Sequence, residues 1–245
     1  MDGHGNRSAV VLFCGDPRRE ERQKNLPPRF LGTLHRELRA IVASLPDVDL
    51  VTASRRGDEL VLTGPGAFVE RTTRTLAEQI DLAIRSCFDS GYSRVVILAG
   101  DVPTLSREVV ADALDRLRSA GPRAVIGPSG DGGFYLAGFN RTPELEWPRI
   151  LEEPERVAAT LAEHAAAARM LLEILPVIDD IDERADAARL LPLRRTASPF
   201  SSIVARLSSL LLSRFTPHPD SFREHAIAAP SSVSLRAPPL HHRSF

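Results

Sequence analysis

The stretch VVILAGDVP (residues 95–103) runs from five apolar residues into a single carboxylate and a proline. An apolar run of this length is typical of a buried strand in a parallel sheet. Ligands of open parallel sheets bind beyond the carboxyl ends of the strands, which is where Asp101 falls. Pro103 disfavours a helical conformation at Val102, so we expect the carboxylate to point into that crevice. A carboxylate there suits a hard divalent cation that holds phosphates. The alternative, that Asp101 caps the next helix, is weaker because Ser106 is better placed for capping.

The chain up to about residue 195 alternates strand-like and helix-like patterns. The strands are expected at 8–14, 49–53, 59–62, 94–99, 124–126, 134–139 and 172–178. The helices are expected at 30–45, 75–91, 106–120, 155–169 and 182–191. This alternation predicts an α/β fold, a three-layer sandwich around a mostly parallel sheet.

The composition changes near residue 196, where Ser, Pro, Arg and His become dominant. We therefore expect one α/β domain over residues 1–195 and a low-complexity, mostly disordered tail over residues 196–245. Residues 203–215 (IVARLSSLLLSRF) are the exception, because their pattern fits a short amphipathic helix. Such a helix packs on the domain, on a partner or on a membrane surface, and packing on the domain is the first expectation.

The bulk composition excludes several classes of protein. The chain has 245 residues and a formal net charge of −1, which implies no general attraction to nucleic acid or to a membrane surface. The two cysteines, Cys14 and Cys87, fall in apolar runs and are expected to be buried free thiols. There is no apolar run of membrane-spanning length, and the first residues are polar, so we expect a cytoplasmic protein without an integral membrane segment.

A glycine-rich segment, GPSGDGGFYLAG (residues 127–138), surrounds Asp131 with Gly130, Gly132 and Gly133. Glycines let a backbone approach a ligand closely. The segment is neither a P-loop nor a dinucleotide-binding fingerprint, because a strand follows it. On its own it fits a hairpin turn. Together with Asp101, it predicts two acidic loops at the ends of neighbouring strands.

A third acidic segment, Asp179-Asp180-Ile181-Asp182, follows a predicted strand. Asp182 is placed to cap the last helix, so at least one of these carboxylates has a structural role. Carboxylates at this density repel each other, and a cation would relieve the repulsion.

Residues 15–28 (GDPRREERQKNLPP) are expected to form a charged loop after the first strand. Arg18, Arg19, Arg22 and Lys24 gather there, and Lys24 is the only lysine of the chain. The loop is either a solvated surface segment or a clamp for phosphate groups. The acidic pair at 47 and 49 comes before its strand, on the wrong side of the sheet for this site.

The segments GDVP and IGPSGDGGFYLAGF, with LPVIDDIDERADAARL closing the domain, resemble a bacterial family with the glycosyltransferase A fold. Its members are named arsenosugar-biosynthesis or selenodomain-associated transferases, and their architecture is similar to that of the guanylyltransferases that build molybdenum cofactor. The resemblance implies the nucleotide-diphospho-sugar transferase fold over about Val10 to Leu191. The family's Lys-Pro-Pro-Gly stretch is replaced here by CGDPRREERQK, so Lys24 is the remaining counterpart of its phosphate-binding residues.

The resemblance also implies roles for single residues, matched position by position. Asp101 corresponds to the aspartate near metal and nucleotide, and Asp131 lies in the loop that faces the acceptor or a second metal site. Asp101 and Asp131 are the predicted catalytic residues. Gly132 and Gly133 correspond to the loop that faces the acceptor. Asp180, Asp182 and Asp186 correspond to the closing motif. The resulting prediction has Asp101, Asp180 and Asp182 as metal ligands, and a set of nucleotide-binding residues: Arg18, Arg19, Lys24, Gly100 and Pro103.

These observations predict an enzyme, a transferase that depends on Mg²⁺ or Mn²⁺ and uses a nucleotide-activated donor, a nucleotide sugar. Glycosyl transfer to a small-molecule acceptor is the first expectation. A nucleotidyltransferase of the guanylyltransferase type is the second, although the loop after the first strand lacks the glycines of a triphosphate clamp. A catalytically inactive binding domain on the same fold is the third.

Overall fold

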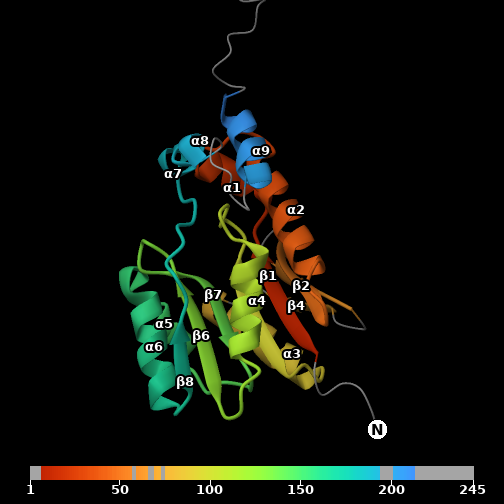
Figure 1. Cartoon of the computed structure of the whole chain (residues 1–245), viewed down its shortest axis with the longest axis vertical. Coiled ribbons are helices and arrows are strands. Elements are labelled where there is room, and N and C mark those ends of the chain that lie inside the picture. Colours follow the sequence, from red (N-terminus) through yellow and green to blue (C-terminus); the bar gives the residue numbers. More distant parts are fainter. Residues whose placement is uncertain (1–6, 57–58, 66–68, 73–74, 194–200, 213–245) are drawn as a thin grey trace, which may run out of the picture. The chain divides into compact units, whose positions relative to one another are not determined.

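A twisted sheet of eight strands forms the centre of the computed structural model (Figure 1). The model describes residues 7–56, 59–65, 69–72, 75–193 and 201–212, which all belong to one unit, Met1–Phe215. The strand order is β4-β3-β2-β1-β5-β7-β6-β8. The strands are β1 (Ser8–Cys14), β2 (Val48–Arg56), β3 (Glu59–Thr63), β4 (Val69–Thr72), β5 (Arg94–Ala99), β6 (Arg123–Pro128), β7 (Phe134–Phe139) and β8 (Leu171–Ile174).

Six of the eight described strands run in the same direction, and β3 and β7 run against them. The prediction of a mostly parallel sheet is therefore confirmed, in the sense that most of the described strands share one direction. Because both reversed strands lie inside the sheet, the β2–β3, β3–β4, β5–β7 and β6–β7 pairs are nevertheless antiparallel. The central pairs, β1–β2 and β1–β5, are parallel and bring the carboxyl ends of these strands to one edge.

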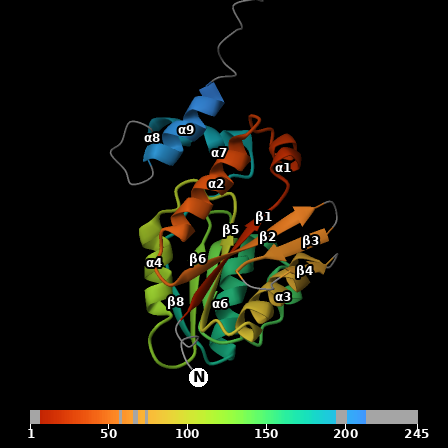
Figure 2. The ribbon, with the colours of Figure 1, turned by 90° about the vertical axis from the view of Figure 1, so that its right-hand side faces the viewer.

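Helices cover both faces of the sheet and complete the three layers (Figure 2). Alternate residues of β1 show why: Val10 packs in one core with Leu34 of α2, and Val11 packs in the other with Ile84 of α3. The first core includes α2 and α4, and the second includes α3, α5 and α6. The helices are α1 (Pro17–Gln23), α2 (Phe30–Ala43), α3 (Leu76–Asp89), α4 (Arg107–Arg116), α5 (Trp147–Ile150), the short 3-10 helix η1 (Pro154–Arg156), α6 (Val157–Ala167), α7 (Arg184–Ala188), α8 (Leu190–Leu193) and α9 (Ser201–Leu212).

The strands at 8–14, 94–99 and 134–139 have the predicted bounds. Thr75 and Glu78 form the capping box that starts α3, and the hydroxyl of Ser106 caps α4. The prediction of one last helix over 182–191 is wrong, because the chain forms two short helices there, α7 and α8. Strand β4 and helix α5 were not predicted, since each has only four residues.

The charged segment after β1 is a helix, so the prediction of a loop over residues 15–28 is wrong. Asp16 caps this helix, α1, by accepting hydrogen bonds from the backbone N–H groups of Arg18 (2.9 Å) and Arg19 (3.3 Å). Pro17 occupies the first helical turn, where a missing N–H costs nothing. The Asp-Pro pair was thus a helix-start signal inside a run of charges.

Helix α9 packs on the domain through its apolar face. Val204, Leu207 and Leu211 are buried in the core that includes α2, and Arg206 forms an ion pair with Glu37 of α2.

A domain boundary at residue 195 stays a prediction, and the predicted tail beyond residue 212 lies outside the described residues. None of the helices in the described ranges combines the length and the apolar character needed to cross a bilayer.

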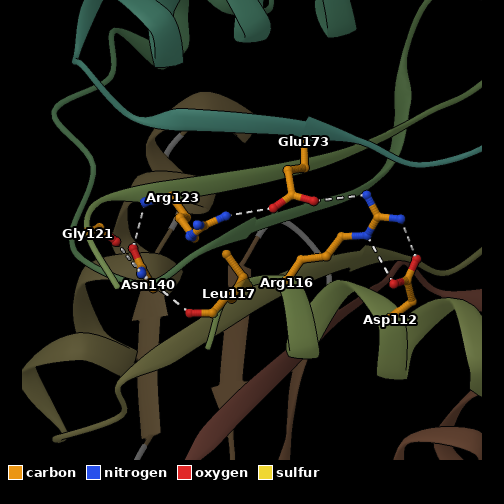
Figure 3. A network of polar contacts seen from close by, with 7 residues as sticks. All are labelled: Asp112, Arg116, Leu117, Gly121, Arg123, Asn140 and Glu173. Carbon is orange, nitrogen blue, oxygen red and sulfur yellow. Dashed lines mark hydrogen bonds and ion pairs between the residues drawn. The ribbon is translucent and has the colours of Figure 1, made fainter. Parts of the chain in front are cut away.

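A polar network fixes edge strand β8 at the end of the sheet where β6 and β8 begin (Figure 3). Glu173 of β8 accepts hydrogen bonds from Arg123 (2.7 Å) and from Arg116 of α4 (3.0 Å). Asp112 holds Arg116 from the preceding turn of α4 (3.0 Å), and Asn140 binds the backbone of Arg123 (2.8 Å). We call these four charged residues, Asp112, Arg116, Arg123 and Glu173, the balanced network. The balanced network fixes the position of β8, the strand that precedes the acidic segment at 179–182.

Candidate functional site

Three acidic segments meet at the edge where β5, β6 and β8 end. The turn after β5 carries Asp101, and the loop between β6 and β7 carries Asp131. The segment after β8 crosses this edge, because Ile178 donates its N–H to Pro128 (3.2 Å) and Ile181 donates its N–H to Asp101 (3.0 Å). Backbone hydrogen bonds therefore place residues 179–182 beside both loops.

Lys24, at the carboxyl end of α1, reaches into this site. Its ammonium donates to the Asp101 carboxylate (2.8 Å), to the carbonyl of Ile181 (2.5 Å) and to the Asp182 carboxylate (3.3 Å). Burial lowers the pKa of Lys24, but the carboxylates of Asp101 and Asp182 outweigh burial and raise the pKa above its usual value. Lys24 is therefore a fixed positive charge that joins α1 to the two acidic segments.

Asp131, Asp180 and Asp182 form the acidic cluster. Each offers an oxygen atom, and these oxygens lie within 4.8 Å of one another. Three carboxylate oxygens at such distances fit a hard divalent cation such as Mg²⁺ or Mn²⁺, which would take water or phosphate oxygens as its other ligands. The donor set thus agrees with the predicted metal, and it uses Asp131 in place of Asp101.

The pKa of Asp180 records the excess of negative charge. Burial raises this pKa, and the carboxylates of Asp101, Asp131 and Asp182 raise it further, to about 7. A bound cation would remove the repulsion that keeps the proton on Asp180. Asp101 is close enough to influence Asp180, although in the described part of the chain it lies outside the group of three. Its assignment as a metal ligand stays a prediction.

The loop that holds Asp131 is shaped by contacts within the chain. Its hydrogen bonds, from Gly132 N–H to Ser129 (3.2 Å) and from Ser129 N–H to Gly133 (3.0 Å), close a hairpin between β6 and β7. The Asp131 carboxylate accepts from the Ser129 hydroxyl (2.5 Å) and the Gly133 N–H (3.0 Å). The hairpin is therefore real, and it also presents Asp131 to the cluster.

Gly132 is required for packing against η1. Its φ is +97°, and a Cβ there would lie 1.9 Å from the carbonyl oxygen of Glu155. A side chain on Gly133 would meet the Ser129 hydroxyl at 2.9 Å. The space beside these glycines is filled by the protein itself, so their predicted role toward an acceptor stays a prediction.

A cleft of about 340 Å³ opens beside Asp101, at the ends of β1, β2 and β5; we call it the β1–β5 cleft. Gly15 and Gly100 line it, together with Glu20 and Gln79. A Cβ on Gly100 would lie 2.4 Å from the carbonyl of Phe13, so only glycine fits there. No arginine is among the described residues that line this cleft. Phosphates bound there would depend on Lys24 and a cation for neutralisation.

The other predicted nucleotide-binding residues are distributed over different surfaces. Arg18 lines a groove between α1 and α2 rather than the β1–β5 cleft, and Arg19 is exposed on α1. Pro103 lines a separate cleft of about 330 Å³, which Asp180 and Ile181 also line. Of the basic residues predicted on the charged segment, Lys24 is the one that the structure brings to Asp101.

Two assignments near the acidic cluster change. Asp182 does not cap the last helix; Glu183 begins α7, and Asp186 accepts the backbone N–H groups of Glu183 (2.9 Å) and Asp182 (3.2 Å). This bonding leaves the carboxylate of Asp182 facing Lys24. Asp186, the other residue of the closing motif, is thus used for local structure.

Sequence reasoning missed Glu20, Gln79 and His35 near this edge. Glu20 and Gln79 line the β1–β5 cleft. Glu20 was one of several charges in a segment predicted as a loop, and Gln79 was a polar residue within a predicted helix. His35 lies under Gly100 on the apolar face of α2, where a histidine reads as an ordinary core residue.

Comparison with known proteins places this geometry in context. Residues 37–151 match the model of a family described as uncharacterized proteins conserved in bacteria (DUF2064). The match covers slightly less than half of the chain. No curated protein matches the chain.

A solved structure from Desulfovibrio desulfuricans G20, assigned as a candidate nucleotide-diphospho-sugar transferase, is similar over 85% of this chain and 98% of its own. Its sequence identity is 22% and its TM-score is 0.65. A CMP:2-keto-3-deoxy-manno-octonic acid synthetase complexed with CTP matches with 10% identity over 77% of this chain and 98% of its own, at a TM-score of 0.48. A mannosyltransferase from Pyrobaculum calidifontis in complex with GDP-Man and Mn²⁺ matches with 15% identity over 83% of this chain and 69% of its own, at a TM-score of 0.39.

The first of these structures shows the fold. The chain is a three-layer α/β protein with the nucleotide-diphospho-sugar transferase, or glycosyltransferase A-like, architecture, as predicted. The structural neighbours are nucleotidyl and glycosyl transferases, and the arsenosugar or selenodomain subtype is not distinguished among them.

Proposed function

We propose that the chain is a metal-dependent transferase that takes a nucleotide-activated donor, a nucleotide sugar, and transfers the glycosyl group to a small-molecule acceptor. The observation that carries the proposal is the acidic cluster beside the β1–β5 cleft, with Lys24 between Asp101 and Asp182. A cytoplasmic location stays a prediction.

The proposed division of roles follows from charge. The donor diphosphate would lie in the β1–β5 cleft, which Gly15 and Gly100 line. Lys24 would turn from Asp101 toward the phosphates as they arrive. Asp131, Asp180 and Asp182 would hold the cation, which when bound supplies positive charge to stabilise the diphosphate leaving group.

Metal and nucleotide should therefore bind together. Two acidic side chains, Glu20 and Asp101, line the β1–β5 cleft, so a diphosphate alone would meet repulsion. A cation bound to the acidic cluster would make the electrostatic potential beside the cleft more positive and so attract the diphosphate. This coupling separates the proposal from an inactive domain, for which nothing requires the two ligands to depend on each other.

Calorimetric titration tests the proposal. The full chain is titrated with Mn²⁺, and then with UDP, GDP, CDP and ADP in the presence and absence of Mn²⁺. We expect at least one nucleotide to bind only with Mn²⁺, and Asp182→Asn to weaken Mn²⁺ binding about tenfold or more. Asp115→Asn, an exposed aspartate in an ion pair with Arg118 on α4, is the matched control and should leave binding unchanged.

A product assay then separates the two chemistries. The proposed enzyme cleaves a nucleotide sugar between the anomeric carbon and the diphosphate oxygen, and it releases a nucleoside diphosphate. A nucleotidyltransferase would instead release pyrophosphate from a nucleoside triphosphate and a sugar phosphate. The transferase proposal would be abandoned if no nucleotide bound with Mn²⁺ and Asp101→Asn changed nothing.

A further inference from the structure

A long groove runs between α1 and α2, on the other side of α1 from Asp101. Its larger part has a volume of about 1150 Å³, and a deeper part of about 220 Å³ adjoins it. The two parts share Asp16, Pro17 and Gly32 as lining residues, so they are continuous. We call this continuous surface the arginine groove. Its larger part is of the size that holds small-molecule ligands or cofactors.

Five arginines line the arginine groove. Four belong to its larger part and one to its deeper part, and none of them forms an ion pair with a residue that the structure describes. They are Arg18, Arg22, Arg29, Arg36 and Arg39. Outside this groove, most arginines whose side chains the structure describes, including Arg85, Arg116 and Arg123, form an ion pair with a carboxylate. Five arginines without such a pair on one groove therefore stand out.

The two carboxylates that line the groove, Asp16 and Glu21, form no ion pair with these arginines, and their oxygens accept backbone N–H groups instead. Asp16 accepts the N–H groups that begin α1. Glu21 is only 5% exposed and accepts the N–H groups of Arg29 (3.0 Å), Leu31 (2.9 Å) and Gly32 (3.4 Å) at the start of α2. Among the five guanidinium groups, that of Arg36 donates a hydrogen bond to the hydroxyl of Thr33 (3.3 Å), and none is paired with a carboxylate of the described residues.

His35 supplies a second, independent feature at the deep end. It is 3% exposed, lines the deeper part of the groove, and makes no hydrogen bond with any described residue. Burial, and then the charge of Arg39, lower its pKa to about 4, so its imidazole is neutral near pH 7. A neutral imidazole offers one donor and one acceptor, and a buried polar group without a partner is costly unless a ligand or water satisfies it.

The arginine groove and the β1–β5 cleft, which Glu20 and Asp101 line, have opposite charge and are separated by the end of β1. Cys14 and Gly15 line both the deeper part of the groove and the β1–β5 cleft, so they form the wall between the two. Lys24 turns toward Asp101, whereas Arg18 and Arg22, one helical turn apart on α1, line the groove. An anion in the groove would therefore need no divalent cation.

We propose that the arginine groove is a binding site for a small molecule that carries a phosphate or diphosphate group, and that this site is distinct from the metal-dependent nucleotide site. One guanidinium group can donate two parallel hydrogen bonds to two oxygens of the same phosphate group. This geometry favours phosphate over a halide ion, which has a single atom. His35 would contact the part of the ligand that enters the deeper end. The inference does not depend on the proposed transferase function.

Inorganic pyrophosphate is the probe for this site. The full chain is titrated with pyrophosphate in EDTA, at fixed ionic strength, by calorimetry and by ³¹P line broadening. We expect saturable one-to-one binding without metal, weakened about tenfold or more in the double variant Arg22→Gln/Arg36→Gln. Both side chains are exposed, so the variant should fold as the parent does. Arg85→Gln, an exposed arginine on α3 outside the groove, should bind as the parent does.

Two further variants decide between the sites. Lys24→Gln and Asp182→Asn should leave metal-free pyrophosphate binding within twofold of the parent, because neither side chain lines the groove. The inference is overturned if pyrophosphate does not bind without metal, if the arginine double variant binds it as well as the parent, or if Lys24→Gln abolishes binding. Failure of the transferase assays would leave this result unaffected.

Discussion

The balanced network and the acidic cluster use the same kinds of side chains at opposite ends of β6 and β8, to opposite effect. In the balanced network, Asp112 and Glu173 face Arg116 and Arg123, so charges cancel (Figure 3). At the other end, Asp101, Asp131, Asp180 and Asp182 lie near one another, and Lys24 pairs with two of these four carboxylates, Asp101 and Asp182. The carboxylates of the acidic cluster repel one another, and a bound cation would relieve that repulsion.

The largest expected effect comes from breaking the balanced network. Glu173→Leu leaves Arg123, whose side chain is 17% exposed, without its carboxylate. We expect the free energy of unfolding to fall by about 2 kcal/mol, because a partly buried charge loses its partner. Urea denaturation measures the change. Glu163→Leu, an exposed site on α6, is the control, and an equal loss there would show that the network has no special role.

Removing Lys24 should destabilise the other end of the sheet, and a metal should reverse the effect. Lys24→Gln leaves Asp101, Asp180 and Asp182 without an opposing charge, and we expect a loss of about 1.5 kcal/mol in EDTA. Mn²⁺ should reduce that loss, since it supplies the missing charge. Thermal unfolding with and without Mn²⁺ measures both values. A loss of the same size in both conditions would contradict the role given to the acidic cluster.

Removing an acidic residue should stabilise this end, the reverse of the result for Glu173. The pKa of Asp180 is about 7 in the folded chain and near 3.8 when unfolded, so ionisation penalises the folded state increasingly as the pH rises from about 4 to 7. Asp180→Asn removes the penalty. We expect the metal-free variant to be more stable than the parent by about 1 kcal/mol at pH 8, with no difference near pH 4. A constant difference across this range would show that charge is not the cause.

The smallest effect is expected at the exposed edge of the balanced network. Asp112→Asn removes one carboxylate from Arg116, which keeps Glu173 as a partner. An exposed pair one helical turn apart contributes about 0.4 kcal/mol. Urea denaturation of Asp112→Asn and Glu173→Leu under the same conditions compares the two losses in the free energy of unfolding. A loss as large as that of Glu173→Leu would mean that Asp112, and not Glu173, holds the network together.

The sheet was predictable because its signals are local. The runs at 8–14 and 94–99 are buried almost throughout, and each is followed directly by a glycine. At Gly100 a side chain would collide with the backbone carbonyl of Phe13. The positions of Asp101, Asp131 and Asp180 followed from the rule that parallel strands end at one edge. What the sequence could not provide was which of these carboxylates lie closest together.

The charged segment after β1 shows why the remaining details were missed. Its density of charge favoured a loop, although Asp16 and Pro17 start a helix there. Once α1 is helical, Arg18 and Arg22 share one face and Lys24 turns to another. The pairing of Lys24 with Asp101 joins residues that are 77 positions apart, and only the packing of α1 on the sheet determines it.

The bridge from Lys24 to Asp101 and Ile181 has a consequence for how the chain reaches its native state. The acidic cluster draws on the loop after β6 and the segment after β8, and Lys24 joins that segment to the end of α1. Contacts between such distant parts of a chain form late, after the loops between them have closed. A partly folded chain would therefore lack the cation site. During refolding, tight Mn²⁺ binding should appear only when the sheet is complete.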